Sequence, residues 1–206
     1  MLKMVKYYIE QSWLLVVAAF AFGLLLAVTN AVWSERIETN KTGKLNALMA
    51  NLIAEAKFEL AAADVPIDAG KGKIVKSNLY KAIGTDGQCK GFCFNASGPG
   101  FADKIEIVIA VGPAFEKIAG FSVLASNETP GFGDRISHDF YLSQFIGAPV
   151  GKLAISKTGD DKIIDDEIIA ISGATVSSDA VINIFNNFLE QIKDNALAEG
   201  VLTAGN

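Results

Sequence analysis

The feature that most limits the fold of this chain is an uncharged apolar run from Trp13 to Trp33. About 20 apolar residues are enough to cross the hydrocarbon core of a membrane, which is roughly 30 Å thick, as a helix. A tryptophan stands at each end of the run, as is typical of residues at the membrane interface. A cleaved signal peptide would have a shorter apolar core of about 7–15 residues. The run therefore predicts a retained transmembrane helix.

The rest of the sequence is long enough for one further domain. With 206 residues, we expect a short tail at 1–12, the membrane helix at 13–33 and a single domain at 34–206. The net charge is −5 and no basic patch is visible, which argues against a nucleic-acid partner. Positive charges flank the apolar run on both sides and leave its orientation open: Lys3, Lys6, Arg36, Lys41 and Lys44.

Hydrophobic periodicity predicts a helix, a series of strands and a final helix. Apolar residues at helical spacing indicate a helix from about Thr42 to Ala63, which Pro66 would end. A second helix is expected around Val181–Ile192, with Gly200 as its terminator. Between them lie short apolar runs separated by Gly- and Pro-rich turns: 80–83, 88–95, 104–111, 118–125, 153–156 and 168–171. The first two should form a hairpin, and the segment at 135–142 should be helical or irregular. This order of elements is typical of an α+β fold with a mostly antiparallel sheet.

Small and hydroxyl residues at 172–178 precede the final helix. The sequence Ser-Gly-Ala-Thr-Val-Ser-Ser leaves Thr175 accessible at a helix N-terminus, where unpaired N–H groups and the helix dipole favour a phosphate. A hydroxyl in this place could hold a phosphate-bearing cofactor or be esterified by it. The alternative is plain helix capping, because Ser and Thr are common N-cap residues.

A second segment, Glu-Thr-Pro-Gly-Phe-Gly at 128–133, follows an expected strand. Pro130 and Gly131 fit the two central positions of a type II turn. Such a turn exposes N–H groups that, together with Thr129, could bond the polar edge of a planar ligand, and Phe132 could pack on its face. The alternative is a tight turn with an incidental glutamate.

Other residues with reactive side chains give no catalytic or metal constellation. Cys89 and Cys93 would lie roughly 13 Å apart on a continuous strand, too far for a disulfide, so we expect two unbridged thiols unless the strand breaks at Gly91. His138 has no nucleophile motif around it and is expected at the surface or at a cap. The acidic stretch at 160–167 does not match a calcium loop and is expected to be solvated.

The two segments together resemble the flavin-carrying subunits of Rnf and Na⁺-translocating NADH:quinone reductase complexes, most closely the G subunit of Rnf. In that family, a Ser-Gly-Ala-Thr segment carries FMN through a phosphoester on its threonine, here Thr175, and a Glu-Thr-Pro-Gly-x-Gly segment lies against the flavin. Here the two segments stand in the same order behind one N-terminal anchor. In this chain Ile169 stands where the family often has Asp, three residues before Ser172, a position that the flavin-attaching enzyme would read.

The resemblance implies a membrane-anchored electron-transfer subunit of a translocase that couples ferredoxin:NAD⁺ oxidoreduction to Na⁺ or H⁺ transport. It places the flavin domain on the extracytoplasmic side of the inner membrane, with other complex subunits, membrane lipid and a flavin transferase as partners. The chain itself would need no catalytic residue. The implied FMN-binding residues are Thr175, Ser172, Gly173, Ala174, Ser177, Ser178, Glu128, Thr129 and Gly131. The alternatives are a membrane-anchored binding or assembly module without redox chemistry, and the related C subunit of the quinone reductase.

Overall fold

The N-terminal part of the chain is a single helix in the computed structural model. The structure describes residues 2–70 and 72–202, with side chains described from Gln11 onward, so Lys3 and Lys6 lie outside the described side chains. Helix α1 spans Leu2–Leu52 without a break. Its segment from Gln11 is apolar and long enough to cross a membrane, with mean hydropathy 2.3 in its most apolar window. The predicted apolar helix is confirmed, and the expected tail is part of it from Leu2 onward.

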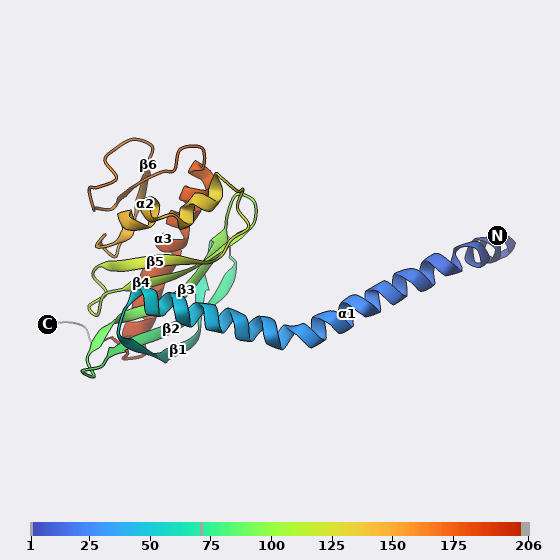
Figure 1. Cartoon of the computed structure of the whole chain (residues 1–206), viewed down its shortest axis with the longest axis horizontal. Coiled ribbons are helices and arrows are strands. Elements are labelled where there is room, and N and C mark those ends of the chain that lie inside the picture. Colours follow the sequence, from blue (N-terminus) through green and yellow to red (C-terminus); the bar gives the residue numbers. More distant parts are fainter. Residues whose placement is uncertain (1, 71, 203–206) are drawn as a thin grey trace. The chain divides into compact units, whose positions relative to one another are not determined.

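The second compact unit, which begins at Leu45, is built on an antiparallel sheet of five strands in the order β1-β2-β3-β4-β5 (Figure 1). Each strand pairs with the next one along the chain, which confirms the expected hairpin and the mostly antiparallel sheet. Turns rich in glycine and proline separate the strands and allow this simple connectivity. The strands are β1 (Ala56–Asp68), β2 (Ile74–Gly84), β3 (Cys89–Pro99), β4 (Lys104–Val111) and β5 (Ile118–Ala125).

Apolar side chains cover both faces of this sheet. Strand β4 shows this best: Ile107 and Ile109 belong to the core under helix α3 (Thr175–Ala198), while Val108 and Ala110 belong to a smaller core. That smaller core is completed by the last turns of α1, including Met49. Figure 1 shows α3 lying across the sheet. Because successive side chains of a strand point to opposite faces, a strand buried on both sides becomes an unbroken apolar run.

The predicted helix from Thr42 to Ala63 is wrong beyond Leu52. The chain turns at Glu55, which has a positive φ of 55°, and continues as strand β1. Pairing with β2 and burial of alternate residues such as Val65 and Ile67 outweigh a helical spacing that alanines make weak. Pro66, expected to end a helix, lies within β1, where it is tolerated because β1 is an edge strand.

The two cysteines face opposite sides of the sheet. A bulge in the β2–β3 pairing falls between the partners of Gly91 and Cys89. It places half-buried Cys89 against the core under α3, whereas buried Cys93 faces the end of α1. Both thiols are free, as predicted.

Shorter elements carry the chain from the sheet to α3. After β5 come two 3₁₀ turns, η1 (Gly133–Ser137) and η2 (Ser143–Phe145), which flank the short helix α2 (Asp139–Leu142). The expectation of a helical or irregular segment here is confirmed. Strands β6 (Ala154–Ser156) and β7 (Glu167–Ile169) then form a small parallel pair. The end of β7 leads directly into the segment at 172–175.

Candidate functional site

The segment at 128–133 forms the turn that its sequence predicts. The N–H of Phe132 donates to the carbonyl of Thr129 at 3.2 Å, and Gly131 has a φ of 79°. This is the pattern of a type II turn with Pro130 and Gly131 at its centre. Thr129, Pro130, Gly131 and Phe132 are all exposed. The turn therefore presents a polar backbone and an aromatic ring at the surface.

The second segment meets this turn at Gly173. Gly173 has a φ of 81°, and a Cβ atom on it would lie 3.3 Å from Cδ1 of Phe132. A backbone bond of 2.9 Å from Ala174 to Ile171 closes the bend before α3. The structure thus brings together two motifs that are distant in the sequence.

The first turn of α3 has no side-chain cap. Ala174 is the N-cap residue and makes no such hydrogen bond, so the capping interpretation of this segment is wrong. Within the part of the chain that the structure describes, no partner is found for the N–H groups of Thr175, Val176 and Ser177. Thr175 is half-buried, and Val176 is exposed beside it. Open N–H groups next to a reachable hydroxyl are suited to a phosphate ester.

Ser178 holds the bend from the inside. Its hydroxyl accepts from the N–H of Ile171 and donates to the carbonyl of Ala174, both at 3.0 Å. The carbonyl of Ser178 accepts from the hydroxyl of Tyr141 at 3.2 Å. Burial raises the pKa of that phenol above its ordinary value, so it remains a neutral donor. Ser178 is fully buried and has protein partners on both sides of its hydroxyl.

Ser177 and Glu128 join the two motifs directly. The Ser177 hydroxyl donates to Oε2 of Glu128 at 2.5 Å, and both side chains are buried. The other carboxylate oxygen accepts from the N–H of Ala102 at 3.0 Å, in the turn between β3 and β4. The Glu128 carboxylate is therefore buried between the β3–β4 turn and the first turn of α3. The next residue, Thr129, is exposed.

Asp134 is a candidate site residue that the sequence did not reveal. Its Oδ1 is buried and has no hydrogen-bond partner among the described residues, and its N–H donates to the carbonyl of Thr129 at 3.3 Å. Such orphaned oxygens are rare and are often explained by an unseen ligand or water. The signal available in the sequence was its position directly after the glycine that ends the 128–133 segment.

Gln144 is a second residue whose role the sequence did not reveal. Its side-chain amide bonds both backbone groups of Ile169, with 2.8 Å to the N–H and 3.3 Å to the carbonyl, and so acts as a neighbouring strand for β7. The Ile169 side chain lies against Gly159, where a Cβ atom would be 2.6 Å from its Cδ1. The position at which the family often has Asp is thus held by Gln144 and packed on the loop before β7.

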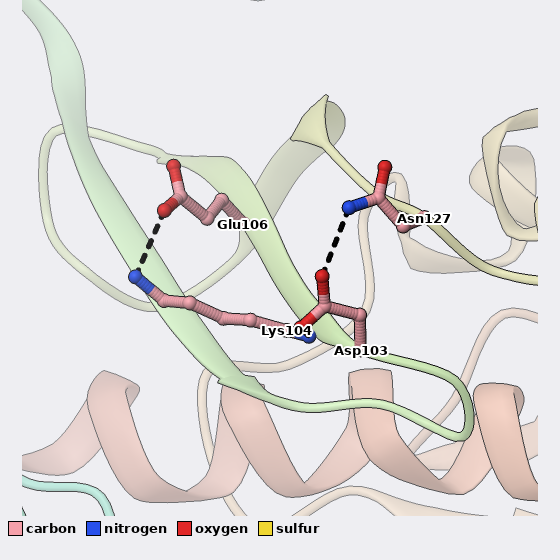
Figure 2. A network of polar contacts seen from close by, with 4 residues as sticks. All are labelled: Asp103, Lys104, Glu106 and Asn127. Atoms are coloured by element: carbon pink, nitrogen blue, oxygen red, sulfur yellow. Dashed lines mark hydrogen bonds and ion pairs between the residues drawn. The ribbon is translucent and has the colours of Figure 1, made fainter. Parts of the chain in front are cut away.

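A cavity of about 780 Å³ lies next to this site, between α3 and the turns that follow β1 and β3. Its walls are mainly apolar and begin on α3 at Ala180: Val75, Pro99, Phe101, Ala180 and Ile184. At its rim, Asp103 accepts from the Asn127 amide at 2.9 Å, and Lys104 pairs with Glu106 at 2.8 Å (Figure 2). Hydrogen bonds from Asn127 and from the backbone of Lys104 lower the pKa of the Asp103 carboxyl. Asp103 and Lys104 at the rim therefore each have a side-chain partner.

The remaining candidates lie outside this site. His138 is exposed and meets Phe140 edge-on, with ring centroids 6.0 Å apart. The residues of the acidic stretch at 160–167 are mostly exposed. No group of three or more potential metal ligands occurs among the described residues.

The similarity of this chain to known proteins includes both motifs. Residues 100–190 match the model of the FMN-binding domain family, and this range holds both segments. The chain is 32% identical over 175 residues to the G subunit of the Na⁺-translocating ferredoxin:NAD⁺ oxidoreductase complex of Acetobacterium woodii, with 82% of this chain and 83% of that protein covered. It is 26% identical over 179 residues to the G subunit of the ion-translocating oxidoreductase complex of Methanosarcina acetivorans, with 86% and 90% covered.

Two solved structures share the fold. The C subunit of the Na⁺-translocating NADH-quinone reductase from Parabacteroides distasonis superposes with a TM-score of 0.55 at 18% identity, over 77% of this chain and 95% of that one. NqrC from Shewanella oneidensis superposes with a TM-score of 0.51 at 23% identity, over 66% and 69%. At these identities the match shows a common fold.

Proposed function

This chain belongs to the family of G subunits of ion-translocating oxidoreductase complexes, and we propose that it is a membrane-anchored electron-transfer flavoprotein with FMN on Thr175. The observation that carries this proposal is the half-buried hydroxyl of Thr175 beside three backbone N–H groups that have no partner among the described residues. An FMN-binding domain needs a place for the phosphate, and these groups offer donors, a favourable dipole and an ester oxygen in one spot.

The residues around Thr175 fit the parts of FMN. Ser172 and Gly173 are exposed and leave the approach open, while buried Ala174 keeps the bend compact. The turn at 129–132 offers backbone groups, the Thr129 hydroxyl and the Phe132 ring to an isoalloxazine. Ser177 and Ser178 support the site from below, because their hydroxyls already bond Glu128, Ile171 and Ala174. The orphaned oxygen of Asp134 adds an acceptor near the turn.

FMN would supply electron transfer, and the protein would supply position and electrostatics. In the proposed phosphoester, the Thr175 side-chain oxygen would be bonded to the phosphorus of the FMN phosphate. An activated flavin nucleotide is the required donor: its nucleotide leaving group departs as the new P–O bond forms, and the hydroxyl proton passes to a base of the transferase or to solvent. No further acid or base of this chain is needed for outer-sphere electron transfer.

The family and helix α1 support a proposal for the partners and the location. The relatives are named as subunits of complexes, so we propose that this chain works with other subunits of an Rnf-type complex that moves Na⁺ or H⁺. The uncharged run at 13–33 would lie in lipid. On the resemblance of the chain to the family, we propose that the flavin domain lies on the extracytoplasmic side, and a reporter fused after Asn206 would determine that side.

The colour of the purified protein tests the proposal against a binding or assembly module without redox chemistry. Full-length protein from a host with a flavin transferase should be yellow, and the colour should stay with the chain after denaturation. The intact-mass spectrum should contain a species that is heavier than the bare chain by one FMN. A colourless protein from that host, at normal mass, would favour the binding module.

A further inference from the structure

We infer that Glu128 is a positioning residue: through Ser177 it fixes the first turn of α3 relative to the turn at 129–132. The inference rests on the proposed function only where it says that Thr175 is positioned for FMN. The contacts of Glu128 do not depend on a bound flavin. The family resemblance suggested that Glu128 touches the cofactor. In the structure it is 5% exposed and its carboxylate is bonded to two other segments of the protein.

The carboxylate joins three segments that are distant in the sequence. Oε2 accepts from Ser177, 49 residues later, and Oε1 accepts from the N–H of Ala102, 26 residues earlier. Its own N–H donates to the hydroxyl of Ser126 at 3.2 Å, which fixes the strand exit. A buried carboxylate with good donors is held firmly, because losing either donor would leave an unpaired polar group in a buried place.

Two glycines make room for this arrangement. A Cβ atom at Gly133 would lie 2.7 Å from Oγ of Ser177 and 2.8 Å from Oε2 of Glu128. A Cβ atom at Gly100 would collide with Oε1 from the other side. The carboxylate therefore fills a space between two backbones that only glycine leaves open, and its position is set by packing as well as by hydrogen bonds.

The bond to Ser177 controls the side of α3 that Thr175 occupies. Residues of an α-helix follow one another by about 100° around the axis, so Ser177 lies roughly 200° from Thr175. Holding the buried Ser177 fixes both the rotation and the height of the first turn. Thr175 and the open N–H groups then stay toward the surface, at a constant offset from Phe132.

Hydrogen exchange of the full-length chain, prepared without flavin in a host that lacks the transferase, tests the positioning directly. Glu128→Ala should speed exchange of the hydrogen-bonded amides of Ala174 and Ser178, and of amides at 100–104, together by about tenfold or more, because both segments lose the same partner. The matched control is Asn127→Ala, which removes a bond to Asp103 in the turn between β3 and β4 (Figure 2), while among the described residues Asn127 makes no hydrogen bond to α3. It should affect 100–104 alone. Unchanged exchange at Ala174 and Ser178 in Glu128→Ala would overturn the inference.

Flavin attachment gives a second readout. Per folded chain, Glu128→Ala should lower the rate of covalent flavin incorporation by about ten- to a hundredfold, because a misplaced hydroxyl is a poor acceptor. Glu128→Gln should recover part of it, since the amide can still bond Ser177. The double variant Glu128→Ala/Ser177→Ala should be no slower than Glu128→Ala alone, because both changes remove one interaction. Additive losses would overturn the inference. Wild-type chain without flavin in its native host would refute the proposed function and leave the exchange result standing.

Discussion

Phe132 and Gly173 are close neighbours across the two motifs: a Cβ atom at Gly173 would come within 3.3 Å of Cδ1 of the Phe132 ring. The proximity depends on a backbone that only glycine adopts easily, since the φ of Gly173 is 81°. The bend before α3 and the turn after β5 therefore approach each other closely at these two residues.

Replacing Gly173 should separate the motifs. Gly173→Ala forces a side chain into the left-handed region, which costs about 1–2 kcal/mol, and presses its methyl group on Phe132. We expect Tm to fall by about 3–6 °C and the flavin environment to change. Calorimetry and the absorbance spectrum measure the two effects.

Gly131→Ala is the matched control for that prediction. Gly131 has a φ of 79°, but a Cβ atom there would have nothing within 4 Å. It should show the same backbone strain without the contact with Phe132. Gly151→Ala, at an open position where no positive φ is found, should be nearly neutral. If Gly131→Ala lowers Tm as much as Gly173→Ala does, the proximity to Phe132 adds nothing to the backbone strain.

Thr129→Ala should alter the flavin without loosening the protein. The Thr129 carbonyl accepts from Phe132 and Asp134, and truncating its exposed side chain leaves those bonds intact. We expect stability within about 0.5 kcal/mol of wild type and a covalent flavin with a shifted spectrum or reduction potential. Spectroelectrochemistry checks this. An unchanged spectrum and potential would mean that the side chain does not reach the ring.

The thiols should respond differently to labelling and to pH. Burial raises the pKa of Cys93 from 9.0 to about 12, so at pH 8 its thiolate fraction is about 10⁻⁴. A maleimide should label half-buried Cys89 in the native protein and both thiols after denaturation, as counted by mass.

The same pKa difference makes stability depend on pH. Above about pH 9 the Cys93 thiol ionises in the unfolded chain first, so its contribution to stability is lost between about pH 9 and 12. Cys93→Ala should remove this part of the alkaline decrease. Rapid native labelling of Cys93 at pH 8 would contradict the burial.

Local pattern predicted most of the sheet but not the start of the domain. The apolar runs at 104–111 and 118–125 coincide with β4 and β5, because glycine and proline turns bound both. The first part of strand β1 was predicted as helix. Its conformation is decided by pairing with β2, which the spacing of apolar residues within β1 does not reveal.

The candidate site divides in the same way. The turn at Pro130 and Gly131 is a local property and was predicted from those two residues. The burial of Glu128 was not, because the groups that surround it, Ala102 and Ser177, come from two other segments. The sequence also did not predict the absence of a side-chain cap on α3. Ser177 and Ser178 have hydroxyls that could cap a helix, but these hydroxyls bond Glu128 and Ala174 in the interior.

Thr175 gives the sharpest test of the proposed attachment. Thr175→Val keeps the shape of the side chain and removes the oxygen that the ester requires, so covalent flavin should be lost entirely. Thr175→Ser keeps an oxygen and should retain part of it. The folded domain should be little changed in both, because Thr175 is half-buried and no side-chain cap depends on it.

Peptide mapping locates the flavin, and neighbouring hydroxyls serve as controls. Ser172→Ala, on the exposed approach to α3, should keep the flavin on Thr175. Since Ile169 stands where the family often has Asp, we expect occupancy below one FMN per chain, and Ile169→Asp should raise it. That aspartate would have to displace the packing against Gly159, so its stability is measured alongside. A flavin mapped to any other serine or threonine, or covalent flavin retained in Thr175→Val, would refute the assignment.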